Sequence, residues 1–221
     1  MAVPTNRFSG GVSVFDTETN ILVATTAVGI APYGVAVNSA GTRSYVANQN
    51  SNSVSVIDTA TNTAIAVTAV GSNPTGVAVN PAGTRAFVTN NGSNNISVID
   101  TATNTVVATV AVGSAPRGIT VNPAGTRAYV ANTNSNSVSV LDTANSAVVA
   151  TVTVGTGPYF GVVVNPAGTR AYVVNQSSNN VSVIDTASNT VVATVTVGSS
   201  PFALGLFIGP SNVIFRDGFE E

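Results

Sequence analysis

The strongest constraint on this chain is a phrase that recurs along it. The stretch from Val121 to Asn132, VNPAGTRAYVAN, returns in nearly the same form at 37–48, 79–90 and 164–175. Each copy is followed by a second phrase, VSVID or a close variant, and one more copy of that phrase stands near the N-terminus. These second phrases end in aspartates separated by 42, 42, 42 and 43 residues: Asp16, Asp58, Asp100, Asp142 and Asp185.

A period in the low forties without a helical pattern predicts a β-propeller, in which each repeat forms one four-stranded blade. The third repeat shows the strands. We expect strand A at 76–80, strand B at 85–90, strand C at 95–100 and strand D at 105–112, because β-branched and aromatic residues dominate these runs. Both faces of strand D carry apolar or small residues, as a sheet between two neighbouring sheets requires.

The turns of the repeat also have a physical basis. Asn80-Pro81-Ala82-Gly83 suits a type I turn between strands A and B, with proline fixing φ at the second position. Between strands C and D, the Asp100 carboxylate can cap the turn and Asn104 tolerates a left-handed conformation.

The two ends of the chain hold incomplete repeats. The N-terminus supplies only strands C (12–15) and D (21–27), and the C-terminus supplies degenerate strands A (203–208) and B (213–216). We therefore expect one all-β domain over 1–221, a five-bladed β-propeller of four-stranded blades. Its closing blade is shared by 1–29 and 199–216, and its full blades cover about 30–71, 72–113, 114–155 and 156–198. Residues 3–6 also align with strand B and compete for that place. We expect a monomer.

The words Phe87-Val88-Thr89-Asn90 and Ala128-Tyr129-Val130-Ala131-Asn132 resemble the signature of the Tyr-Val-Thr-Asn (YVTN) propeller repeats. The resemblance covers almost the whole chain. In that family the repeats occur in bacterial and archaeal surface and secreted proteins. The resemblance thus implies an extracytoplasmic propeller and names no ligand or reaction.

Composition excludes several partners. Only 7% of residues are charged, the net charge is −2 and lysine is absent, so the chain cannot build the basic surface that nucleic acid requires. No apolar run reaches the roughly 18 residues of a membrane span, and the absence of cysteine excludes disulfides and thiolate metal sites.

The two termini bear on localisation. The start, from Met1 to Thr5, has no signal-peptide pattern, which leaves a cytoplasmic protein or a mature form with Met1 in place of its leader. We favour the mature form, secreted or on the cell surface, because the ending from Phe215 to Glu220 resembles a short ending of many secreted bacterial proteins.

One charged pair repeats in every full blade. Antiparallel pairing places the arginine that starts strand B opposite the aspartate that ends strand C, and Tyr45 opposite Val56. A ring of such charges suggests an ion site, but its repetition favours a structural latch that is at least partly buried. The latch residues are Arg43 with Asp58, Arg85 with Asp100, Arg127 with Asp142, and Arg170 with Asp185. Asp16 lacks such an arginine, because Asn212 occupies that place, and Arg7 or Arg216 are the candidate substitutes.

Ligand binding is expected where the repeats differ, directly after the proline that begins each strand A. Since strand A is the innermost strand of a blade, these residues should ring one mouth of the channel. The Asn-rich loops lie beside them and either bind sugars or form hydrogen bonds to their own backbone. Packing as lids over the blade ends is the alternative role. The predicted ligand-binding residues are Tyr33, Arg117, Tyr159, Phe160 and Phe202, while Thr75 occupies the same position in another repeat.

Catalysis has few candidate groups, because histidine, cysteine and lysine are all absent. Lactonase-like propellers coordinate a metal with Glu, Asn and Asp in the channel, and the four full blades contain no such glutamate. We therefore expect no cofactor, no metal and no catalytic residue, and a non-enzymatic module that binds a glycan or peptide, or serves as a structural element. The alternative is a carboxylate-dependent hydrolase or lyase with a site at the channel mouth, but the one close acidic pair in a blade, Asp16 and Glu18, lies in a turn.

Overall fold

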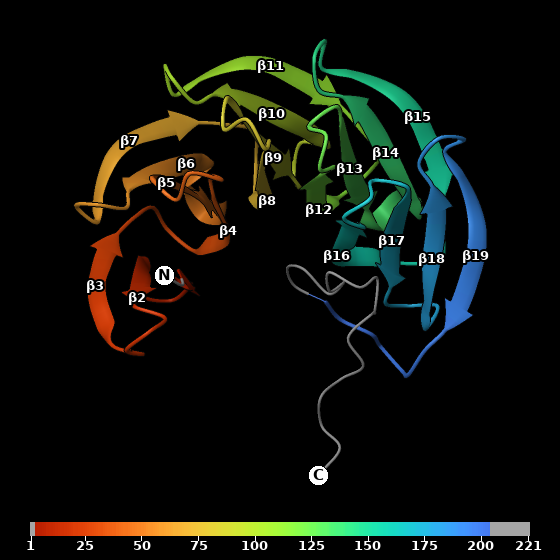
Figure 1. The fold of residues 1–221 in the computed structure, drawn as a ribbon, viewed down its shortest axis with the longest axis horizontal. Helices are drawn as coiled ribbons and strands as arrows, with labels where there is room; N and C mark the ends of the chain where they lie inside the picture. Colours follow the sequence, from red (N-terminus) through yellow and green to blue (C-terminus); the bar gives the residue numbers. More distant parts are fainter. Residues whose placement is uncertain (1–2, 204–221) are drawn as a thin grey trace. The chain divides into compact units, whose positions relative to one another are not determined.

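The computed structural model describes residues 3–203. They form an all-β protein with five antiparallel sheets, the blades of a five-bladed β-propeller (Figure 1). The chain divides into two compact units, Met1–Pro116 and Arg117–Glu221. The expected degenerate strands A and B of the closing blade, 203–208 and 213–216, begin at the limit of the described residues or lie outside them, and so does most of the expected C-terminal share of that blade.

Unit 1 holds three sheets. The first has three strands among the described residues, in the order β1-β2-β3, and the next two have four each, in the orders β4-β5-β6-β7 and β8-β9-β10-β11. The strands are β1 Thr5–Asn6, β2 Gly11–Phe15, β3 Leu22–Ala27, β4 Pro32–Val37, β5 Arg43–Asn48, β6 Ser53–Asp58, β7 Thr63–Ala69, β8 Pro74–Val79, β9 Arg85–Asn90, β10 Asn95–Asp100 and β11 Thr105–Ala111, with a short 3-10 helix η1 Gln49–Ser51.

Unit 2 holds two sheets of four strands, in the orders β12-β13-β14-β15 and β16-β17-β18-β19. The first residue of β12, Pro116, belongs to unit 1. The strands are β12 Pro116–Val121, β13 Arg127–Asn132, β14 Ser137–Asp142, β15 Ala147–Thr153, β16 Pro158–Val164, β17 Arg170–Asn175, β18 Asn180–Asp185 and β19 Thr190–Thr196, with a 3-10 helix η2 Thr133–Ser135.

The predicted strands and registers of the repeat are confirmed. Strands β9 and β10 have the predicted bounds, and β8 begins two residues earlier than expected. Arg43 faces Asp58 and Tyr45 faces Val56 across β5 and β6. In the first sheet, β1 pairs with β2, so residues 5–6 take the place for which the sequence offered two candidates; the other candidate lies outside the described residues.

The turns follow the predicted chemistry. Gly83 N donates to Asn80 O at 2.8 Å, and Gly83 has a φ of +70°, which an L side chain rarely adopts. The Asn80 side-chain oxygen accepts hydrogen bonds from Thr84 N and Arg85 N. At the other turn, Asp100 Oδ1 accepts hydrogen bonds from Ala102 N and Thr103 N, and Asn104 has a φ of +54°.

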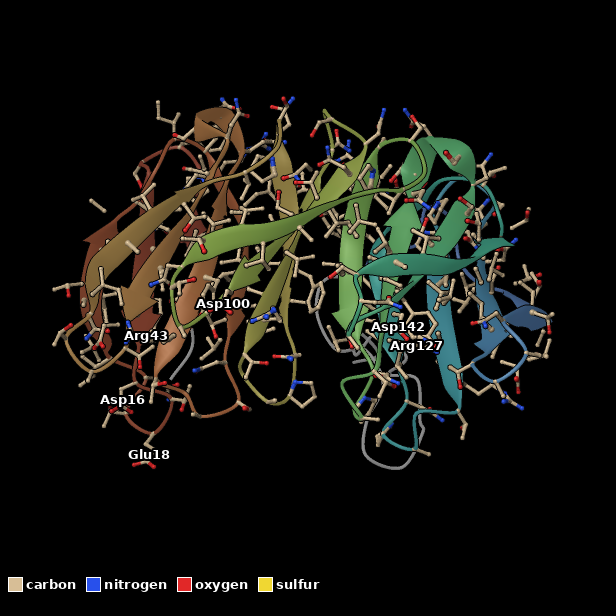
Figure 2. All side chains as sticks on the ribbon, turned by 90° about the horizontal axis from the view of Figure 1, so that it is seen from above. Asp16, Glu18, Arg43, Asp100, Arg127 and Asp142 are labelled. Carbon is tan, nitrogen blue, oxygen red and sulfur yellow. The ribbon has the colours of Figure 1, made fainter. Side chains whose placement is uncertain are left out.

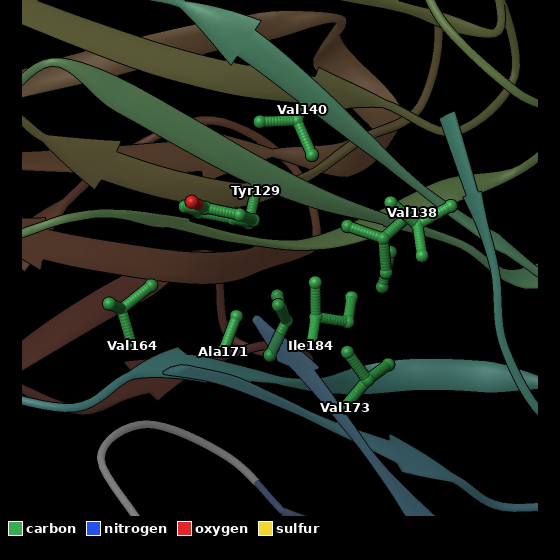
Figure 3. Packing of buried hydrophobic residues seen from close by; sticks show 10 residues of the cluster. Tyr129, Val138, Val140, Val164, Ala171, Val173 and Ile184 are labelled. Atoms are coloured by element: carbon green, nitrogen blue, oxygen red, sulfur yellow. The ribbon is translucent and has the colours of Figure 1, made fainter. Parts of the chain in front are cut away.

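The core lies between the faces of consecutive sheets. In unit 1, Tyr45, Val54 and Val56 of the second sheet pack against Ala86, Val88 and Ile99 of the third. In unit 2, residues of β13, β14 and β15 pack against residues of β16, β17 and β18 (Figure 3). The labelled side chains of that cluster are Tyr129, Val138, Val140, Val164, Ala171, Val173 and Ile184. Each sheet is therefore buried on both faces where it has neighbours, which explains its near-continuous apolar sequence.

Neighbouring strands A approach each other closely. A Cβ added at Gly34 on β4 would lie 2.2 Å from Thr75 O on β8, and one added at Gly118 on β12 would lie 2.3 Å from Phe160 O on β16. No side chain fits there, so glycine is required at this place in each strand. The residues beside these glycines are thereby held near their counterparts in the next sheet of the same unit.

A candidate ligand site on strands β12 and β16

Unit 2 brings four of the predicted ligand-binding residues together, and we call Arg117, Tyr159, Phe160 and Phe202 the aromatic cluster. Arg117 stands second in β12, and Tyr159 and Phe160 stand at the same place in β16. Phe202 follows the proline of the next loop. All four occupy the repeat position at which the sequence predicted a site, and the close approach of strands A explains why they meet.

The guanidinium of Arg117 is the centre of the aromatic cluster. Its Nη1 donates a hydrogen bond of 2.9 Å to the Tyr159 hydroxyl, and its Cζ lies 4.4 Å from the centroid of the Tyr159 ring and 5.8 Å from that of Phe160. A cation over an aromatic face is attracted by the ring quadrupole. The positive charge is thus held in a defined orientation within an aromatic surround.

The three rings also contact one another. Tyr159 and Phe160 pack edge to face at a centroid distance of 4.8 Å, and Phe202 lies 5.6 Å from Tyr159 and 6.3 Å from Phe160. Phe202 nevertheless remains 52% exposed. The three rings therefore pack against one another while about half of the Phe202 surface stays accessible to solvent.

A bulge in β16 accounts for the two adjacent aromatic residues. Pro158 faces Asn175 and Val162 faces Val173. The chain therefore advances by four residues on β16 where it advances by two on β17. On β4, three steps lie opposite two, from Pro32 to Val35. The extra residue is the one that lengthens a single repeat to 43, and bulges commonly redirect side chains near functional sites.

The fifth predicted residue, Tyr33, lies in unit 1. The Arg7 guanidinium lies 5.1 Å from its ring centroid, and Thr5 Oγ1 donates to its carbonyl oxygen at 2.9 Å. Arg7 Nη2 also donates to Gln49 Oε1 at 3.0 Å. Sequence reasoning missed this role of Arg7 and considered it only as a partner of Asp16, although Arg7 holds the place that Gln49 holds in the next repeat. Thr75, at the same repeat position, is fully buried and faces the Thr89 hydroxyl.

The Asn-rich loops have a structural use. Asn136 and Asn179 each adopt a left-handed conformation, and their side-chain oxygens accept hydrogen bonds from Gly157 N and Ser200 N of the following loops. Asn52 and Asn94 make the same bond in unit 1. These amides thereby fix the loops that lead into the strands of the aromatic cluster.

The predicted latches form in three repeats. Arg127 pairs with Asp142 at 2.6 Å, and Figure 2 labels both residues. Arg85 pairs with Asp100 and Arg170 with Asp185 in the same way. The arginine side chains are 37–38% exposed and the aspartates 21–22% exposed, so the pairs lie at the surface rather than in the core. Arg43 faces Asp58 in register, but the structure gives no ion pair between these two described residues.

The repeated aspartates are held ionised by their turns. Each carboxylate accepts hydrogen bonds from backbone amides two and three residues later, and these bonds are the main reason that its pKa is lowered. In three repeats the second oxygen faces the arginine. The hydrogen bonds of the turn therefore lower the pKa of each aspartate more than the arginine does.

Unit 1 also contains a cleft of about 460 Å³ beside the β2–β3 turn, which we call the acidic cleft. Asp16 and Glu18 line it together with Val23, Thr59 and Asn62 (Figure 2). Hydrogen bonds from Thr19 N and Glu18 N lower the pKa of Asp16, which disfavours the proton that a general acid must carry. Within residues 3–203, no group of three or more His, Cys, Asp or Glu side chains is placed to hold a metal ion.

Comparisons with known proteins agree with the fold. The family model described as lactonase, 7-bladed beta-propeller, matches residues 59–147. A comparison with curated proteins finds no match. Among residues 3–203, no helix has the length and apolar character needed to cross a membrane.

Three solved structures are similar to the chain. Hydrazine synthase of Kuenenia stuttgartiensis is 29% identical with a TM-score of 0.72, over 75% of this chain and 49% of its own, so the chain spans about half of that protein. A functionally unknown protein from Desulfotomaculum acetoxidans is 17% identical with a TM-score of 0.84, over 95% and 69%. Dihydro-heme d1 dehydrogenase NirN is 20% identical with a TM-score of 0.72, over 88% and 43%. The sheets, the family model and these neighbours together show that the chain is a β-propeller protein.

Proposed function

We propose that this chain is a non-enzymatic β-propeller that binds saccharides at the aromatic cluster. The observation that carries the proposal is a half-exposed phenyl ring, Phe202, backed by two further rings and a stacked guanidinium. Such a ring offers an apolar platform for the face of a sugar, and Arg117 adds a planar hydrogen-bond donor. Aromatic walls with a few polar groups are the usual composition of ligand sites.

The aromatic cluster itself offers few groups for chemistry other than binding. The whole chain lacks histidine, cysteine and lysine, and no acidic side chain belongs to the aromatic cluster. The cluster can orient and hold a ligand, but none of its members is a general base or a nucleophile at neutral pH.

We propose an extracytoplasmic location and a monomeric state as part of this function. The location rests on the resemblance to the YVTN repeats, and the monomer on the expectation that the two chain ends complete one blade. A mass of one chain by light scattering at low concentration is the expected result, and a mass of two or more chains would contradict it.

The experiment is a screen of the protein against immobilised glycans and peptidoglycan. The wild type should bind a saccharide, and the double variant Tyr159→Ala, Phe202→Ala should lose that binding while its melting temperature stays close to the wild type. Val192→Ala is the matched control, because Val192 on β19 is as exposed as Phe202, at 52%. If the double variant bound with unchanged affinity, the binding site would lie outside the aromatic cluster. If the protein bound only peptides, the ligand would be a peptide and not a saccharide.

A second function is favoured by the acidic cleft and the lactonase-type match. Thr59 and Asn62, which line the cleft beside Asp16 and Glu18, lie within the matched residues. A carboxylate-dependent hydrolase or lyase would use ionised Asp16 as a base. Turnover of a lactone or glycoside panel that disappears in Asp16→Asn and persists in Asp142→Asn would establish this activity, and no turnover by the wild type would exclude it for the panel.

A further inference from the structure

We propose that unit 1 carries a second saccharide site, formed by Arg7, Phe8, Tyr33 and Gln49, which we call the N-terminal patch. Its ligand class rests on the proposed function of the aromatic cluster, whereas its existence rests on the geometry of unit 1. In this patch the guanidinium of Arg7 lies 5.1 Å from the Tyr33 ring centroid and donates to Gln49 Oε1 at 3.0 Å. Thr5 fixes the backbone of Tyr33 through a hydrogen bond of 2.9 Å.

The N-terminal patch repeats the design of the aromatic cluster. Tyr33 and Tyr159 occupy the same place in their repeats, directly after the proline that begins β4 and β16. In both units a guanidinium lies over this tyrosine, 5.1 Å from the ring in one and 4.4 Å in the other. The same cation–aromatic pair is therefore built twice, once in each unit.

The two arginines reach their tyrosines from unrelated sequence positions. Arg117 belongs to β12 and directly follows the proline that begins strand A, whereas Arg7 belongs to the β1–β2 connection, the loop between strands B and C, where Gln49 holds the equivalent position of the next repeat. Copying of one repeat unit cannot explain both. Both pairs are explained if the tyrosine at this repeat position functions together with a hydrogen-bond donor stacked on its ring.

Each site also presents an accessible phenyl ring. Phe8 follows Arg7 and is fully exposed, which is unusual for a phenylalanine that contributes nothing to a core. The β1–β2 connection is anchored next to the β3–β4 loop by the hydrogen bond from Val28 N to Gly10 O, and Ile30 in that loop is 66% exposed. Phe8 is therefore an exposed ring on an anchored loop, next in sequence to Arg7, whereas Phe202 is half exposed and packs on two other rings.

These groups fit the chemistry of an N-acetylated or neutral sugar ring. Phe8 offers an apolar surface to the ring face, and Arg7 offers planar N–H donors to hydroxyl or acetamide oxygens. Gln49 supplies an amide that both donates and accepts. The chain would then bind two saccharide rings, one per unit.

The test uses the full chain with 3-fluorotyrosine at all five tyrosines and the tetramer of N-acetylglucosamine as the probe. Fluorine NMR reports each tyrosine separately after single Tyr→Phe assignments. Tyr45 and Tyr129 are internal controls, because both are fully buried in the core. We expect the signals of Tyr33 and Tyr159 to shift on titration while those two remain fixed.

The variants separate the two sites. Phe8→Ala should abolish the Tyr33 shift and leave the Tyr159 shift intact, since Phe8 is fully exposed and its removal leaves the fold unchanged. Ile21→Ala, an exposed apolar change elsewhere in unit 1, should leave both shifts intact. A shift at Tyr159 alone in the wild type would overturn the second site and keep the proposed function. A shift at Tyr33 alone would keep the second site and overturn the aromatic cluster, and a shift at neither would overturn both.

Discussion

A single hydroxyl in the core of unit 2 gives a sharp prediction about stability. Tyr129 is fully buried, and its hydroxyl has no hydrogen-bond partner in the part of the chain that the structure describes. Phe87 fills the same repeat position in unit 1 and is equally buried, so a phenyl ring fits this place. Tyr129→Phe should therefore remove an unsatisfied polar group without leaving a cavity.

The magnitude follows from the cost of burying a hydroxyl. An unsatisfied buried polar group costs about 1–3 kcal/mol, so Tyr129→Phe should raise the free energy of unfolding by about 1 kcal/mol. Tyr45→Phe is the matched control, because the Tyr45 hydroxyl at the same repeat position bonds to Thr101. Loss of that bond should lower the free energy of unfolding by about 0.5–1.5 kcal/mol.

Urea unfolding followed by circular dichroism measures both changes. With a slope of about 1–3 kcal/mol per molar urea, the two midpoints should move in opposite directions by roughly 0.3–1 M at an unchanged slope. If Tyr129→Phe lowered the midpoint as much as Tyr45→Phe does, the hydroxyl of Tyr129 would have to be satisfied and the reasoning would fail.

Three further predictions concern glycine, charge and pH. Gly29→Ala should lower the free energy of unfolding, measured in thermal melts, by about 1–3 kcal/mol, because the new Cβ would lie 2.6 Å from the Asn48 side chain. Gly198→Ala at the same repeat position should be tolerated, because the new Cβ meets no atom within 4 Å. Arg127→Ala should lower the melting temperature more than Arg43→Ala, and the difference should shrink in high salt, since only the first arginine makes an ion pair among the described residues. The pKa values of the repeated aspartates are lowered in the folded chain. Their contribution to stability is therefore complete above the unfolded pKa of about 3.9 and is lost as the pH falls through the lower folded pKa values. An acid titration should accordingly show unfolding only below about pH 4.

The repeat made most of the fold predictable. Asparagine, proline and glycine at fixed positions specify the turns, and the register that follows places Arg43 opposite Asp58 as expected. The period of the aspartates then fixes the number of sheets. Local rules suffice here because each strand pairs with the strand next to it in sequence.

The sites were less predictable because they depend on residues that break the repeat. Variation after the conserved proline pointed to Arg117 and Tyr159, which do meet. The stack of Arg7 on Tyr33 was not predicted, because the repeat places the β1–β2 connection near the start of β4 but does not determine where the Arg7 side chain points. The missing pair of Arg43 and Asp58 likewise depends on side-chain placement, which the register alone does not determine.

The most direct test of the account is a crystal structure of the chain with the saccharide that binds most tightly in the glycan screen. The account predicts a sugar ring stacked on Phe202, with polar atoms of the ring within hydrogen-bond distance of Arg117 or Tyr159. A sugar bound instead in the acidic cleft beside Asp16 and Glu18 would contradict it and would favour the hydrolase or lyase.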